Sequence, residues 1–297
     1  METTLNPPVA VERPGPRAAL ELLKPVTWFP PMWAYGCGLV SAGAPLLENW
    51  VDALLGVALA GPLVCGTSQA VNDWFDRHVD AINEPDRPIP SGRVPGRWGL
   101  YIAVAWTFLS MLVAAALGPV VFTAAIFGLV MAWAYSAPPA RLKRSGWWGP
   151  GTVGLCYEGL PWITGAAVLS GGVPRAEIFV LAIAYSVGAH GIMTLNDFKA
   201  VAGDRHTGLE SLPVVLGERL AAQFACVIMA LAQTVVITFL FVWGHMVHAA
   251  IVTTMLALQL AAMRKLMRDP AGLAPWYNMT GVTLYVFGMM VCANAMR

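Results

Sequence analysis

Long stretches of the chain carry no charged side chain, and short charged segments separate them. The intervals without Asp, Glu, Lys or Arg are 25–47, 53–72, 98–140, 145–157, 159–174, 178–196, 220–263 and 270–296. A helix needs about 20 apolar residues to cross a bilayer, so the intervals 98–140 and 220–263 are each long enough for two crossings. We predict that these pairs of helices turn over at Gly118-Pro119 and at Gly244-His245.

Two shorter intervals flank Glu158 and together make one more helix with this acid embedded in it. His190 lies inside another apolar stretch. Ionisable groups within a membrane are costly and usually functional, although each of these two could instead make an interhelical hydrogen bond. The pattern predicts an all-α, polytopic membrane protein with nine spans, near 26–47, 52–72, 98–117, 119–137, 149–170, 176–196, 219–242, 246–266 and 275–296.

The overall composition agrees with a membrane protein. Of the 297 residues, 57% are hydrophobic and only 12% are charged, whereas a soluble domain carries roughly a quarter charged residues. The mean hydropathy is +0.62. The formal net charge of +1 gives no reason to expect a nucleic-acid partner. We expect the lipid bilayer as the surroundings, a polar N-terminal segment at 1–24, and a single transmembrane domain at 25–297.

The basic residues predict how the helices are oriented. With the N-terminus in the cytoplasm, the N-terminal segment and the inward-facing segments between spans together hold sixteen of the 18 Lys and Arg side chains. Arg175 and Arg297 then lie outside. Because cytoplasmic loops are enriched in Lys and Arg, we predict a cytoplasmic N-terminus and a periplasmic C-terminus.

The acidic residues are concentrated in two of the segments on the predicted cytoplasmic side. In the first, Asn72, Asp76 and Asp80 are spaced four apart, and the helix can continue to about Glu84, the residue before a proline. Their oxygen atoms therefore lie along one helix face. Such a stripe suits Mg²⁺, which takes oxygen ligands and is commonly completed by substrate phosphates. The alternative is a solvated helix end whose acids pair with nearby arginines.

The second acidic segment follows the predicted span 176–196. Asp197 and Asp204 are seven residues apart, so they share a face if the helix continues beyond the membrane boundary. Metal ions that bridge a diphosphate need carboxylates on two sides and cations near the leaving group. Lys199 and Arg205 are interleaved with these acids. The two segments together therefore favour a metal and diphosphate site over two solvated helix ends.

A basic turn at 141–144 faces the same predicted compartment. Arg141, Lys143 and Arg144 follow Tyr135-Ser136-Ala137-Pro138-Pro139 at the end of a span. By itself such a turn is typical of a positively charged membrane anchor. Because it faces the same compartment as the acidic segments, Lys143 is a candidate phosphate-binding residue.

At these segments the sequence resembles the UbiA superfamily of intramembrane prenyltransferases. The first signature of that superfamily, NxxxDxxxD, matches Asn72, Asp76 and Asp80. More narrowly, four segments resemble the chlorophyll and bacteriochlorophyll synthases within it, especially the bacterial enzymes: 24–38, 72–93, 135–143 and 196–217. The resemblance implies a UbiA-like bundle of nine helices around a central cavity that opens to the cytoplasmic side.

The resemblance also implies the activity. It is esterification of the propionate of a (bacterio)chlorophyllide with a C20 isoprenoid, geranylgeranyl or phytyl, taken from its diphosphate with Mg²⁺. The location would be a bacterial inner membrane, cytoplasmic or photosynthetic, with other pigment-biosynthesis or photosynthetic proteins as possible partners. A carboxylate acceptor has a pKa near 4 and is already ionised, so no general base is required.

Roles for individual residues follow from that mechanism. We expect the metal ligands to be Asn72, Asp76, Asp80, Asp197 and Asp204. Asp76, Asp80 and Asp204 would be essential for catalysis, with Arg87 and Lys143 on the phosphates; the lesser phosphate-binding candidates are Arg77, Arg93, Lys199 and Arg205. Trp74 or Phe75 could stabilise an allylic cation through its ring face. The proline-rich loop 84–97 could exclude water as a lid.

One position departs from the superfamily. Its second signature is usually DxxxD, and when its last Asp is matched to Asp204, the first falls at Ala200. Asp197 or Asn196 is then the nearest replacement.

Two other functions stay open at this stage. One is a prenyltransferase acting on a quinone or haem precursor. The other is a cation-coupled transporter, although its site is expected near the bilayer midplane and not at one membrane face.

Overall fold

The computed structural model describes residues 13–297, and within that range it contains helices and no β-strand. An isolated bridge pairs Ser145 with Glu210. The α-helices are α1 (Pro16–Leu22), α2 (Phe29–Ala42), α3 (Trp50–Ala58), α4 (Gly66–Asn83), α5 (Trp98–Ala116), α6 (Pro119–Ser136), α7 (Trp148–Gly154), α8 (Leu160–Ser170), α9 (Ala176–Asn196), α10 (Val201–Thr207), α11 (Leu212–Leu216), α12 (Glu218–Val242), α13 (Met246–Leu266) and α14 (Pro270–Ala295).

Two of the long helical segments contain a π-helical stretch. Leu59–Cys65 joins α3 to α4, and Leu155–Gly159 joins α7 to α8. The first stretch contains Pro62 and the second is followed closely by Pro161. Proline lacks a backbone N–H and collides with the preceding turn, so a wider turn accommodates it without ending the helix. The chain therefore stays helical from 50 to 83 and from 148 to 170.

The two predicted points of helix reversal are confirmed. Gly118 has a φ of 110° between α5 and α6, and α6 begins at Pro119, where a missing N–H costs nothing. Gly244 has a φ of 84° between α12 and α13. Glycine adopts these positive φ values without strain, so both hydrophobic intervals reverse at these points. Helix α4 ends at Asn83, one residue before the predicted limit.

Each predicted span coincides with a helical segment of the structure. Within residues 13–297, six helices are long and apolar enough to cross a membrane: 50–83, 98–116, 119–136, 176–207, 218–242 and 246–266. The protein is therefore a membrane protein with an all-helical fold. The other predicted spans correspond to α2, to α7–α8 and to α14, and their crossing of the membrane stays a prediction.

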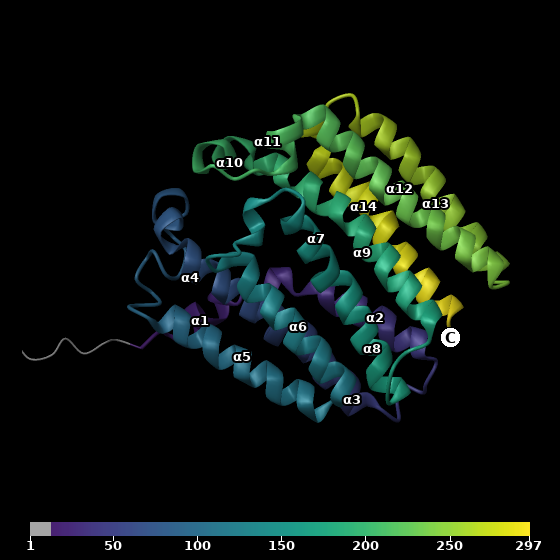
Figure 1. Ribbon diagram of the computed structural model, residues 1–297, viewed down its shortest axis with the longest axis horizontal. Helices are drawn as coiled ribbons and strands as arrows, with labels where there is room; N and C mark the ends of the chain where they lie inside the picture. The colour runs from purple at the N-terminus through teal and green to yellow at the C-terminus, as the bar shows by residue number, and fades with distance from the viewer. Residues whose placement is uncertain (1–12) are drawn as a thin grey trace, which may run out of the picture.

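The helices pack as two groups with α2, α7 and α8 between them (Figure 1). Helix α4 packs against α5 and α6, while α9 packs against α12 and α13 packs against α14. Fully buried aromatic residues join α8 to α9 and α14. Trp162 stacks on Tyr185 with ring centroids 5.6 Å apart, and Tyr185 meets Tyr285 at 5.0 Å. Aromatic pairs of this kind stabilise a core beyond the area they bury.

Two neighbouring cavities lie among these helices. The central cavity, about 450 Å³, is lined from α2, α4, α6, α7, α9, α14 and the two π-helical stretches. The acidic cavity, about 300 Å³, is lined from α4, α7, α10 and the loop 141–146. Tyr135 and Met193 line both cavities. The side of the membrane to which the cavities open stays a prediction.

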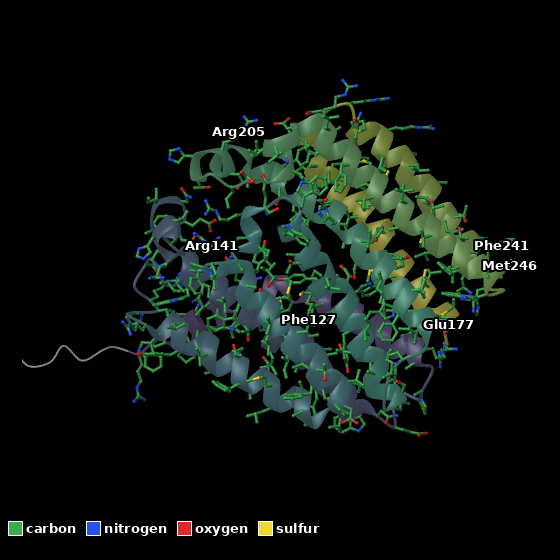
Figure 2. The ribbon with its side chains drawn as sticks, in the orientation of Figure 1. Phe127, Arg141, Glu177, Arg205, Phe241 and Met246 are labelled. Carbon is green, nitrogen blue, oxygen red and sulfur yellow. The ribbon has the colours of Figure 1, made fainter. Side chains whose placement is uncertain are left out.

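The acidic cavity lies toward one end of the molecule. Figure 2 shows Arg141, which lines it, and Arg205 of α10 toward one end of the helices, and Glu177, Phe241 and Met246 at the opposite end. The hydrophobic pattern places the first pair on the predicted cytoplasmic side and the other three residues on the predicted periplasmic side. The fold thus separates the residues of the two predicted sides along the length of the helices.

Candidate active site

The acidic cavity brings together the carboxylates of both acidic segments. Asp76 and Asp80 reach it from α4, and Asp197 and Asp204 reach it from the segment that follows α9. Lys143 lines the same cavity from the basic turn. These five residues were predicted as site residues from three distant parts of the sequence, and the fold places them around one space.

Asp76 is held by the basic turn. Lys143 donates a hydrogen bond from Nζ to Asp76, and Arg141 lies 3.6 Å from the same carboxylate. Burial lowers the pKa of the Lys143 ammonium, while the charge of Asp76 acts in the opposite direction. The basic turn therefore does more than anchor the chain, because two of its cations face the acids.

Arg87 connects two buried carboxylates of α4. Its guanidinium lies 2.8 Å from Asp80 and 3.4 Å from Asp73. Asp73 is almost completely buried and also accepts a hydrogen bond of 2.6 Å from Lys24. Asp73 was not distinguished from the neighbouring acids by sequence. Its position one residue after Asn72 places it on another helix face, and that was the available signal.

The helix that carries the second acidic segment does not continue as one α-helix. It ends at Asn196, and a 3₁₀ turn, Asp197–Ala200, precedes α10. Asp197 and Asp204 were expected to share a face if this helix continued unbroken, and the 3₁₀ turn means that this condition is not met. A 3₁₀ turn rotates the chain by 120° per residue instead of 100°. Both side chains nevertheless line the acidic cavity.

Asp204 is fixed by a residue that the sequence reasoning did not single out. Ser211 donates a hydrogen bond of 2.7 Å to the Asp204 carboxylate, and both residues are buried. Ala200 lies between the two acids on the wall of the same cavity, at the position where the superfamily signature has its first Asp. The alanine side chain at position 200 cannot supply an oxygen ligand. The carboxylates that the described segment 197–204 offers to the cavity are therefore those of Asp197 and Asp204.

Asn72 occupies a different position from the aspartates with which it shares a stripe. Its side chain donates a hydrogen bond of 3.2 Å to Ser136, and it lines the central cavity. Asp76 and Asp80, one and two turns farther along α4, line the acidic cavity. The stripe therefore runs from one cavity to the next.

The donor set suits Mg²⁺ when a substrate completes it. Within residues 13–297, no group of three or more His, Cys, Asp or Glu side chains is gathered closely enough to hold a metal ion. The carboxylates instead face each other across the cavity from two walls. Mg²⁺ is usually bound through one or two carboxylates, waters and substrate phosphates, and all the acids here offer oxygen. The residues fit a Mg²⁺–diphosphate complex better than a free ion.

Arg87 does not itself line either cavity, and neither do the four lesser phosphate-binding candidates. Arg77 donates a hydrogen bond of 2.6 Å to the carbonyl of Trp74 and lies 4.2 Å above its ring. Arg93 pairs with Glu21 of α1, whereas Lys199 and Arg205 are exposed. Arg93 thereby ties the loop 84–97 to α1. A role for these four residues in binding phosphate stays a prediction.

The aromatic residues expected at the site are also elsewhere. Trp74 lies beneath Arg77, and Phe75 packs edge-on against Trp133 at 6.3 Å. Neither lines a cavity within the described range. The aromatic residue at the junction of the two cavities is Tyr135. Its place at the end of an apolar span, directly before the basic turn, was the sequence signal that could have identified it.

Comparison with known proteins gives the same family for almost the whole chain. Residues 27–288 match the model of the UbiA prenyltransferase family. The chain is 65% identical over 284 residues to the bacteriochlorophyll synthase 33 kDa chain of Cereibacter sphaeroides, covering 96% of this chain and 94% of the relative. It is 34% identical to the chloroplastic chlorophyll synthase of Avena sativa, covering 93% and 75%.

A solved structure has the same fold. It is a UbiA homologue from Archaeoglobus fulgidus bound to DMAPP and Mg²⁺, with a TM-score of 0.70 and 20% sequence identity. The match covers 93% of this chain and 99% of that one. At this level of identity the likeness concerns the fold alone.

Proposed function

The chain belongs to the UbiA prenyltransferase family, and we propose that it transfers a C20 isoprenoid group from its diphosphate to the propionate of a (bacterio)chlorophyllide. It is a prenyltransferase enzyme, and its likeness to bacteriochlorophyll synthase at 65% identity supports this acceptor over a quinone or haem precursor. Family membership likewise speaks against a cation-coupled transporter. Geranylgeranyl diphosphate and phytyl diphosphate both remain candidate donors of the isoprenoid group.

The observation that carries the site assignment is the junction of the two cavities at Tyr135. The acidic cavity offers charges of both signs, which suit a diphosphate and its metal. The central cavity is lined mainly by apolar groups and suits the hydrocarbon and ring portions of the substrates. We therefore place the bond that breaks, between the isoprenoid carbon and the diphosphate oxygen, near Tyr135.

Two cations of this chain are ready to act on the diphosphate. Lys143 lines the acidic cavity and is paired with Asp76, and Arg87 is paired with Asp80, which lines the same cavity. As the carbon–oxygen bond breaks, negative charge develops on the leaving diphosphate. Cations fixed before the reaction stabilise that charge without reorganising. Bound Mg²⁺, held by Asp76, Asp80, Asp197 and Asp204, would supply further neutralisation of the diphosphate.

The acceptor completes the reaction. A propionate oxygen forms a bond to the allylic carbon, and the electron pair of the breaking bond leaves with the diphosphate. Because the propionate is ionised at neutral pH, no proton has to be removed. The apolar wall of the central cavity excludes water, which would otherwise hydrolyse the allylic cation.

We also infer the membrane orientation from the position of the site. The acidic cavity lies among the segments that carry the predicted inward-facing Lys and Arg residues. A cytoplasmic acidic cavity places the N-terminus inside and the C-terminus in the periplasm. The diphosphate substrate would then enter from the cytoplasm.

The activity is tested with membranes that contain the protein. They are incubated with Mg²⁺, geranylgeranyl diphosphate and bacteriochlorophyllide, and the esterified pigment is measured after extraction. We expect ester formation that a chelator abolishes and added Mg²⁺ restores. Membranes with Asp76→Asn protein serve as the control. Absence of ester from the wild-type protein with either C20 diphosphate would refute the proposed function.

A further inference from the structure

The central cavity contains one acid that the reaction described above does not use. Glu158 lines this cavity from the π-helical stretch 155–159 and is only 6% exposed. Its Oε2 atom is buried and has no hydrogen-bond partner among residues 13–297. A buried polar group without a partner costs roughly 1–3 kcal/mol, so such a group calls for an explanation.

The surroundings of Glu158 offer no cation to pair with it. Among the described residues that line the central cavity, none is Lys, Arg or His. Burying a charge without a partner costs a large amount of free energy. The Glu158 side chain is therefore more stable as the neutral acid, which has an O–H to donate. Glu158 also lies on a π-helical turn, a feature that is frequent at functional sites.

The position of Glu158 relative to the acidic cavity can be read from its helix. Pro150 lines the acidic cavity, and Glu158 follows eight residues later on the same helical segment. At 1.5 Å per residue this separation is about 12 Å along the axis. A group bound at Glu158 therefore lies about two helical turns from Pro150, in a part of the central cavity that the acidic cavity does not share.

The two substrates differ in what they can offer this acid. Beyond its diphosphate, an isoprenoid chain is hydrocarbon and cannot accept a hydrogen bond. A tetrapyrrole ring carries carbonyl groups at its edge, and the ring with its propionate arm is long enough to reach from the junction toward Glu158. The unpartnered acid is therefore better explained by the acceptor than by the isoprenoid.

We propose that Glu158 recognises a carbonyl group on the edge of the acceptor ring, on the side remote from the reacting propionate. This inference rests on the proposed function, because it requires a tetrapyrrole acceptor. It makes Glu158 a specificity-determining residue: an acceptor with a carbonyl at that edge is bound through a hydrogen bond, and an acceptor without it leaves the acid unpartnered.

A matched pair of acceptors tests the proposal. Bacteriochlorophyllide a carries an acetyl group on its ring, and the analogue in which vinyl replaces this acetyl lacks that carbonyl. We expect Glu158→Leu to raise KM for bacteriochlorophyllide a about tenfold. It should leave KM for the vinyl analogue and for geranylgeranyl diphosphate unchanged. Glu158→Gln keeps a donor and should recover most of the preference for acetyl over vinyl.

A spectroscopic measurement makes the result independent of how well the Leu variant folds. A hydrogen bond lowers the stretching frequency of the acetyl carbonyl, which resonance Raman spectroscopy detects in bound pigment. We expect a lowered frequency with the wild-type protein and a different frequency with Glu158→Gln, because an amide is a different donor. Leu155→Met is the control, since Leu155 lies on the same π-helical turn but not on the cavity wall among the described residues.

The possible results separate the inference from the proposed function. Wild-type protein that forms no ester with either acceptor contradicts the proposed function itself. Active wild-type protein, with the same acetyl-to-vinyl preference in all Glu158 variants and an unshifted carbonyl frequency, overturns the role of Glu158. A rise in KM for geranylgeranyl diphosphate alone overturns it too, because the acid would then lie along the isoprenoid.

Discussion

Asp73 and Asp76 are three residues apart on α4, and we expect their removal to have opposite consequences. Asp73 is 1% exposed, is paired with Lys24 and Arg87, and does not line either cavity within the described residues. Asp76 is 21% exposed and lines the acidic cavity. Replacement of each by Asn removes one negative charge from the same helix with little change in volume.

The structure gives a magnitude for each change. Breaking a buried ion pair costs about 3–5 kcal/mol of stability, and Asn keeps one acceptor oxygen, so Asp73→Asn should cost about 3 kcal/mol. The pair of Asp76 with Lys143 is partly exposed, and its loss should cost about 1 kcal/mol or less. For turnover, removal of a charge-organising group beside the diphosphate should reduce kcat about 10²–10³-fold in Asp76→Asn.

Two measurements on the same purified samples separate these effects. Denaturant titration in detergent reports stability, and formation of esterified pigment at a temperature where both variants are folded reports turnover. We expect Asp73→Asn to be unstable but active when folded, and Asp76→Asn to be stable and inactive. The reasoning fails if Asp76→Asn is the less stable protein, or if folded Asp73→Asn loses turnover as completely as Asp76→Asn does.

Three further predictions address orientation, the second acidic segment and the basic turn. A reporter fused after Arg144 should be cytoplasmic and one fused near Gly171 periplasmic; the reverse at either point would exclude the nine-span orientation. Asp197→Ala should lower turnover and raise the Mg²⁺ requirement, and adding Ala200→Asp should restore part of both; wild-type behaviour of the single variant would remove Asp197 from the site. Lys143→Met should raise KM for geranylgeranyl diphosphate by roughly tenfold to a hundredfold, since a charge-assisted hydrogen bond is lost, while Lys143→Arg should recover part of it; an unchanged KM in Lys143→Met would place the diphosphate elsewhere.

Several features of this protein follow from local sequence. The length of an apolar interval limits the number of crossings, and a glycine followed by proline sets where a helix can reverse, as at Gly118. The residue before Pro85 limits α4, which ends at Asn83. The spacing of Asp76 and Asp80 places both on one helix face, and the structure has both on the wall of the acidic cavity.

The assignment of each charged side chain to a partner required the tertiary structure. Arg77 and Arg87 occur in the same acidic segment, yet Arg87 reaches Asp80 while Arg77 turns to the ring of Trp74. In the sequence, Arg77 and Arg87 are both cations close to several carboxylates. Their difference depends on the path of the loop after α4 and on which helix face meets the cavity, and neither is a local property of the chain.

The sequence alone determined the helical membrane class of this protein, the two points where its long apolar intervals reverse and the residue types of its site, because these depend on hydrophobic length, on proline and glycine stereochemistry and on helical spacing. The tertiary structure decided that a 3₁₀ turn beginning at Asp197 separates α9 from α10, that Tyr135 joins the two cavities, and that Glu158 faces the central one. Each of these depends on contacts between segments far apart in the chain. Packing against distant helices sets the direction of a side chain, and a pattern read along one segment contains no information about that packing.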